Sequence, residues 1–123
     1  MASVFETTAG SAIGYVSGNG GAVTQATSKS TGVTLNKACG AITMNGAALA
    51  DATTVSFTVT NSVVAASDVV IVNHSSGGTA GAYTVDANAI AAGSFAISVR
   101  NVSGGSLSQA IVLSFAVIKG AAA

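Results

Sequence analysis

Apolar residues recur at every second position in several short runs, and this alternation is the clearest pattern in the chain. The runs at 53–61 and 93–101 show it best, with mostly Thr and Ser at the intervening positions. Because successive side chains of a β-strand point to opposite faces, each run predicts a strand with one buried face. The residues that we expect to face the core are Val55, Phe57, Val59, Phe95, Ile97 and Val99.

The run from Gln109 to Lys119 differs, because both of its faces are mostly apolar. One face consists of Ile111, Leu113, Phe115 and Val117, and the other of Val112, Ser114, Ala116 and Ile118. A strand with one solvated face carries polar residues on that face. We therefore expect both faces of this strand to be covered, the second one by another subunit. Val112, Ala116 and Ile118 are candidate interface residues.

Turn-forming residues divide the chain from residue 21 onward into about eight such runs. Asn45-Gly46 and the segment 103–106 are the strongest turn signals. This spacing predicts an all-β domain over 21–123, built as a two-sheet antiparallel β-sandwich. Jelly-roll-like and immunoglobulin-like sandwiches both fit, but the Cys and Trp framework of immunoglobulin domains is missing. Residues 47–52 have the composition of a short helical turn, and residues 88–92 are expected to be a connection.

Residues 1–20 show little periodicity and contain four glycines. We interpret them as an extended N-terminal arm, in keeping with the usual looseness of chain termini. Phe5 and Tyr15 are its large aromatic side chains, so they are the residues expected to anchor the arm on a neighbouring subunit.

Charge is the compositional feature that changes this picture most. Only 7% of residues are charged, and four basic and four acidic residues cancel. Nucleic-acid binding requires clustered Lys or Arg, so the sequence excludes a nucleic-acid partner. No apolar run approaches the ~18–20 residues of a membrane span, and the start lacks the features of a secretory signal. We expect a protein made and kept in a cytosol, with a surface that lies against other proteins.

Residues suited to chemistry are scarce. His74 is the only histidine and Cys39 the only cysteine, so neither a disulfide within the chain nor a His/Cys zinc site is predicted. The Asp residues lie near turns, where Asp normally bonds to the backbone. No catalytic residue, metal ligand or cofactor site is assigned, and we expect a protein that is not an enzyme. Cys39 is expected to be a small buried hydrophobe.

Three segments resemble small virion proteins of tailed bacteriophages: the run 20–37, Thr79-Ala-Gly-Ala-Tyr83 and the closing run 106–119. Among such proteins, the jelly-roll cement, or decoration, proteins of short-tailed phages, such as the tropism-switching Bordetella phage, are the functional analogue that the resemblance suggests. The resemblance implies a protein of the head exterior, made in the bacterial host cytoplasm. It implies two partners: the major capsid protein, whose subunits it bridges, and a second copy of itself, a homodimer in preference to a trimer. The alternative is a tail-fibre or head-fibre component that binds a receptor through loops such as 74–79.

Overall fold

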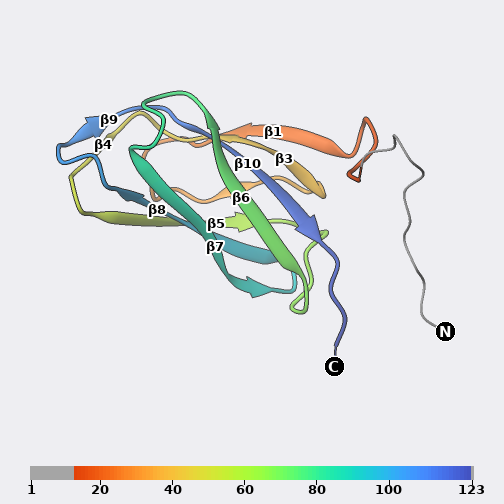
Figure 1. The fold of residues 1–123 in the computed structure, drawn as a ribbon. Coiled ribbons are helices and arrows are strands. Elements are labelled where there is room, and N and C mark those ends of the chain that lie inside the picture. The colour runs from red at the N-terminus through yellow and green to blue at the C-terminus, as the bar shows by residue number, and fades with distance from the viewer. Residues whose placement is uncertain (1–12, 123) are drawn as a thin grey trace.

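Two four-stranded β-sheets stack face to face and enclose the core of the molecule (Figure 1). The computed structural model describes residues 13–122. Its ten strands are β1 (Gly20–Thr24), β2 (Val33–Thr34), β3 (Cys39–Thr43), β4 (Ala48–Leu49), β5 (Thr54–Thr60), β6 (Val69–Ser76), β7 (Tyr83–Ala91), β8 (Ser94–Asn101), β9 (Leu107–Ser108) and β10 (Val112–Ile118). β4 and β9 form a separate two-stranded pair at one end of the sandwich.

The first sheet has the strand order β1-β3-β10-β6, so β10 is one of its central strands. β10 runs antiparallel to β3 and β6, while β1 and β3 are parallel to each other. Leu113, Phe115 and Val117 are at most 3% exposed. This face of β10 lies in the core, as the alternation of the sequence predicts.

The second sheet has the order β2-β5-β8-β7, with β5, β8 and β7 antiparallel and β2 parallel to β5. Its inner face is formed by the apolar rows that the sequence predicts: Phe57, Val59, Phe95, Ile97 and Val99 are all buried, and Val55 is half-buried. The rings of Phe95 and Phe115 meet across the core, with centroids 5.5 Å apart. The two sheets are therefore held together by interdigitating apolar side chains.

The all-β, two-sheet sandwich expected from the sequence is confirmed, with four differences. Ten strands are present instead of about eight, because β4 and β9 form an additional pair. β4 lies in the segment 47–52, where a helical turn was expected; one isolated helical turn is too short to be stable. β7 continues through 88–91, past a register shift and a positive φ at Ala89. Two strand pairs, β1–β3 and β2–β5, are parallel.

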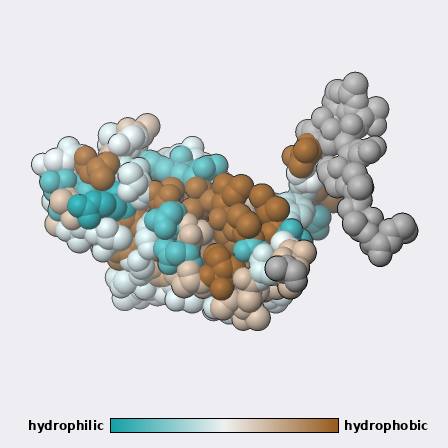
Figure 2. Space-filling model, turned by 60° about the horizontal axis from the view of Figure 1, so that its bottom comes forward, coloured by the Kyte–Doolittle hydropathy of each residue, from teal (hydrophilic) through white to brown (hydrophobic). Residues whose placement is uncertain are grey.

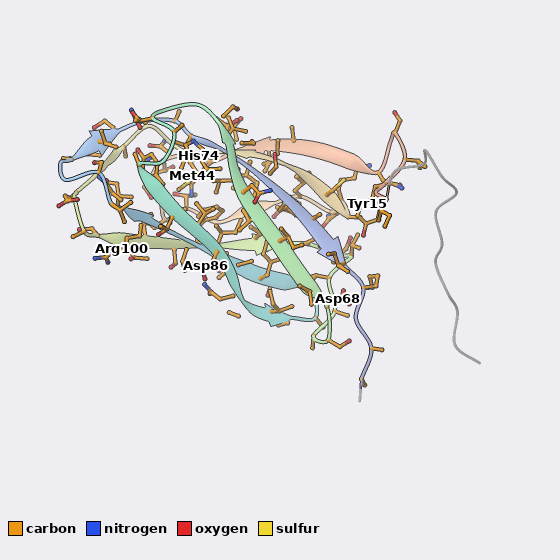
Figure 3. The ribbon with its side chains drawn as sticks, in the orientation of Figure 1. Tyr15, Met44, Asp68, His74, Asp86 and Arg100 are labelled. Carbon is orange, nitrogen blue, oxygen red and sulfur yellow. The ribbon has the colours of Figure 1, made fainter. Side chains whose placement is uncertain are left out.

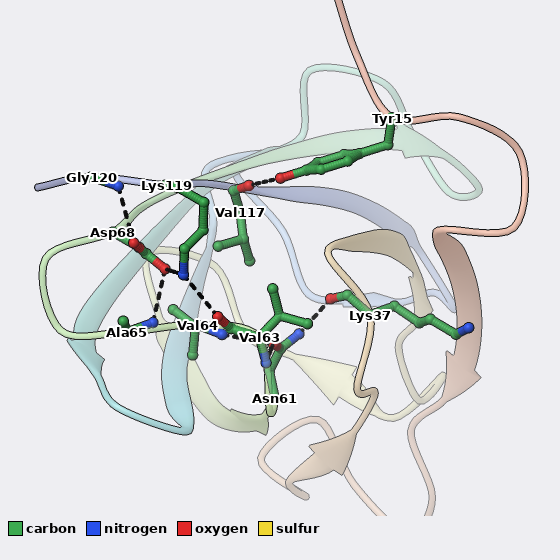
Figure 4. A network of polar contacts seen from close by, with 10 residues as sticks. All are labelled: Tyr15, Lys37, Asn61, Val63, Val64, Ala65, Asp68, Val117, Lys119 and Gly120. Carbon is green, nitrogen blue, oxygen red and sulfur yellow. Dashed lines mark hydrogen bonds and ion pairs between the residues drawn. The ribbon is translucent and has the colours of Figure 1, made fainter. Parts of the chain in front are cut away.

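Asn61 joins two loops at one end of the sandwich through side-chain hydrogen bonds (Figure 4). Its side chain is fully buried, and its amide donates to the carbonyls of Leu35 and Lys37 at 2.8 and 2.7 Å. Its carbonyl oxygen accepts from the amides of Val63 and Val64 at 2.8 and 3.1 Å. One side chain thus satisfies four backbone groups, on two segments far apart in the sequence.

Lys29 performs a similar role at another loop, although it carries a charge. It is 4% exposed, and its ammonium donates to the carbonyls of Asn45 and of Gln109, the latter at 2.6 Å. Gln25, also buried, donates to the Lys29 carbonyl and accepts from the Asn45 amide. Burial lowers the pKa of Lys29. The segment 25–31 is therefore tied to the connections that precede β4 and β10.

Candidate functional site

The outer face of the β1-β3-β10-β6 sheet is the candidate site, and we call it the apolar face. It is built from the alternate residues that the strand register places opposite the core. Its members are Gly20, Ala22, Thr24, Cys39, Ala41, Thr43, Val69, Ile71, Asn73, Val112, Ser114, Ala116 and Ile118. None of these is an acidic or basic residue, and most are small or aliphatic. Such a surface suits contact with another protein.

Large hydrophobic side chains on the molecular surface concentrate at this face. Residues 13–122 contain seven exposed large hydrophobics, and all but Val102 lie either on the apolar face or on the segment 13–16 that precedes it. On the face itself, Val69 is 55% exposed, Ile71 47% and Ile118 48%. Figure 2 shows hydrophobic residues gathered in one area beside the N-terminal segment.

The outer face of the other sheet has the opposite character. Ser56 and Ser98 bond across β5 and β8 at 2.7 Å, and Asn88 donates to both Ser98 and Asp86. Arg100 is exposed on the same face, far from Tyr15 (Figure 3). The two outer faces of the sandwich therefore differ, because one is rich in hydroxyl groups and the other is apolar. We call the molecule two-sided in this sense.

The N-terminal segment reaches onto the apolar face. The Tyr15 hydroxyl donates to the carbonyl of Val117, near the end of β10. A groove of about 540 Å³ lies here, and its lining consists of Ile13, Gly14, Tyr15, Ala116, Ile118 and Lys119. One hydrogen bond thus ties the segment to the C-terminal part of β10, and the two segments line the groove together.

The structure brings together three of the five residues that the sequence nominated for an interface. Tyr15, Ala116 and Ile118 line the same groove. Val112 lies on the same face at the other end of β10, half-buried. Phe5 lies outside the described residues.

Val69 and Ile71 were missed as surface residues. The run 68–73 is apolar at its four central positions, a sequence pattern compatible with a strand covered on both faces, so it does not single out these two residues as exposed. In the structure Val72 is buried, while Val69 and Ile71 point outward and are exposed. Cys39 also lies on the apolar face and is half-buried, so the prediction of a buried thiol is wrong.

An ion pair between Lys119 and Asp68 holds the chain directly after the end of β10 (Figure 4). The Asp68 carboxylate accepts from the Lys119 ammonium, from the Gly120 amide at 3.0 Å and from the Ala65 amide at 2.8 Å. The Lys119 ammonium also donates to the Val63 carbonyl at 3.0 Å. The hydrogen bond from Lys119, which has the largest effect, and the one from Gly120 lower the pKa of Asp68 to about 2. Burial acts in the opposite direction and raises this pKa.

Acid is expected to weaken the fold through Asp68. Because the folded pKa of about 2 lies below the ordinary value of 3.8, the carboxylate stabilises the fold above pH 3.8. This contribution is lost as the pH falls from 3.8 to about 2. Urea unfolding of the wild type and of Asp68→Asn should show a difference in stability at pH 7 that shrinks in this range. Asp86→Asn, which removes an exposed carboxylate, is the matched control. A difference for Asp68→Asn that stays constant with pH would contradict the assignment.

A second, smaller hollow of about 200 Å³ lies at the loop between β6 and β7, lined by His74, Tyr83 and most of the residues between them. The His74 ring bonds to the Gly77 carbonyl at 2.6 Å and meets Tyr83 edge-on. The Tyr83 hydroxyl donates to the Gln109 side chain at 2.8 Å, and burial raises the pKa of Tyr83. These polar groups bond to one another and to the loop backbone, an arrangement that stabilises the loop.

No cluster of three or more His, Cys, Asp or Glu that could hold a metal ion occurs within residues 13–122. That part of the chain also has no helix of the length and apolarity needed to cross a membrane.

Comparison with known proteins gives no match. No protein-family model, no curated protein and no solved structure is significantly similar to this chain.

Proposed function

We propose that this chain is a phage capsid cement protein, which binds the outer surface of the head shell and stabilises it by bridging subunits of the major capsid protein. The observation that carries the proposal is the apolar face, a four-stranded sheet exterior without acidic or basic residues. The resemblance of three segments to small virion proteins supports the same function. In this function the chain performs no chemical step, because binding energy alone stabilises the shell.

The expected strength of one contact is modest. Four strands about 4.8 Å apart, with five to eight residues each and a rise of about 3.3 Å per residue, give the face an area of roughly 400 Å². Burying that area contributes on the order of 10 kcal/mol at ~25 cal/mol per Å². Association itself costs about 4–15 kcal/mol. Stable attachment therefore requires several contacts for each bound unit, as on a symmetric shell that offers repeated sites.

Receptor binding by a tail-fibre or head-fibre component is the alternative. It requires polar or aromatic groups free to meet a ligand, and the loop 74–79 is the candidate segment. In that loop His74 bonds to Gly77, and the Thr79 amide and hydroxyl bond to the Gln109 side chain. These groups are occupied within the molecule, which favours the cement function.

Binding to heads tests the proposal. Purified protein added to heads assembled without it should attach in many symmetry-related copies and raise the temperature at which heads release their DNA. Electron microscopy should place the protein on the outside of the shell, with the apolar face in contact with it. Attachment to tails alone, or no attachment to heads, would overturn the proposal.

A further inference from the structure

β6 is an edge strand without the usual protection against pairing with another chain. It is the last strand in the order β1-β3-β10-β6, and among residues 13–122 no strand pairs with its other side. Its eight residues contain no Gly, Pro, Lys, Arg, Asp or Glu. Edge strands normally carry such residues or a bulge, because unpaired backbone groups otherwise act as a template for a further strand.

The other three edges of the sandwich are protected. β2 is only two residues long, and β1 has five residues and begins with two glycines. β7 carries Asp86 and is interrupted by a register shift beside Ala89, which has a positive φ. The irregularity in the pairing of β6 with β10 falls near the end of β6, so Val69–His74 is regular. β6 is thus the single long, regular and uncharged edge in the described part of the chain.

The register identifies the backbone groups that this edge offers. Val117 donates its amide to Ala38, on the β3 side of β10, at 2.8 Å. Since alternate residues of an antiparallel strand point their backbone groups to opposite sides, Ala116 and Ile118 face β6. They pair with Ile71 and Val69. The amides and carbonyls of Val70 and Val72 therefore point to the open edge.

We propose that β6 pairs antiparallel with β6 of a second copy of this chain. With Val72 opposite Val72 of the second copy on a two-fold axis, Val70 lies opposite His74 and Ile71 lies opposite Asn73. Every pair is free of Asp, Glu, Lys and Arg, so self-pairing places no like charges opposite one another. A symmetric contact of this kind closes after two copies. The two sheets become one eight-stranded sheet, and the two apolar faces become continuous.

This pairing does not depend on the proposed function, and its test uses the isolated protein. Failure of the dimer would leave the head-binding experiment unaffected, and failure of head binding would leave the dimer unaffected.

Sedimentation and amide hydrogen exchange test the pairing directly. The wild type should sediment with twice the mass of one chain. The amides of Val70 and Val72 should be protected from exchange, and this protection should fall on dilution. A single-chain mass with both amides unprotected would overturn the proposal. Protection that does not change with concentration would also overturn it, because the covering strand would then belong to the same chain.

Substitution of Val70 separates the backbone contact from the side chain. Val70→Pro removes one amide donor per copy from the open edge and should weaken the dimer roughly tenfold or more. Val70→Ala keeps the amide and is the matched control, which should remain a dimer. Circular dichroism establishes that both variants are folded. A folded Val70→Pro that associates like the wild type would overturn the proposal, and the exchange measurement on the wild type decides the question independently if this variant does not fold.

Discussion

Ala116→Arg is expected to reduce binding to phage heads at least about 30-fold while leaving the subunit folded. Ala116 lies on the apolar face, in a central strand and beside the Tyr15 groove. An arginine here would hold a partner away from the sheet and leave an unpaired charge in the contact. Such a charge costs about 2–5 kcal/mol, or a factor of roughly 30 to several thousand in affinity. Titration of heads with labelled protein measures the effect.

Ala96→Arg is the matched control for this prediction. Ala96 is also a half-buried alanine in a central strand, but it lies on the outer face of the other sheet. The same change of charge and volume is therefore made on the hydroxyl-rich side, and head binding should be retained. Equal losses in the two variants would assign the effect to net charge, and equal retention would exclude the apolar face as the binding surface.

Asn61→Ala is expected to lower the free energy of unfolding by about 3 kcal/mol or more. The alanine leaves two carbonyls and two amides, partly or fully buried, without their partner. Each such unsatisfied group costs about 1–3 kcal/mol when no water replaces the lost bond. Chemical denaturation at neutral pH measures the loss.

Asn36→Ala is the control for that experiment. Asn36 is exposed, and its side chain accepts a single hydrogen bond, from the Ser62 amide at 3.0 Å. Water can replace this bond, so a loss of only about 0.5–1 kcal/mol is expected. If the two variants lost similar stability, the four-bond role of Asn61 would be wrong.

The features that the sequence predicts well are those that depend on neighbouring residues. Strands β5 and β8 follow from strict alternation, because a half-buried strand needs one apolar face and one polar face. The inner face of β10 follows from the same rule. The apolar outer face of β10 was also recognised, since Val112, Ala116 and Ile118 stand where polar residues are expected.

The features that the sequence does not predict depend on contacts between distant segments. Lys29 stands between two serines and resembles a surface residue, yet it is buried because carbonyls from two distant connections converge on it. The role of Asn61 likewise requires the loops at 35–37 and 63–64 to meet. Ile71 is exposed because no second layer of the described residues packs over it on the outer face of the sheet, which local alternation does not indicate; Ile118 in the central strand β10 is equally exposed on the same face.

The two-sided character of the sandwich has a consequence for the particle. If the apolar face contacts the shell, the sheet that carries Ser56, Thr58 and Ser98 becomes the outer coat of the head. A decorated head would then show hydroxyl groups and few ions to the medium. Its electrophoretic mobility should be lower than that of a bare head, and it should adsorb less to charged resins.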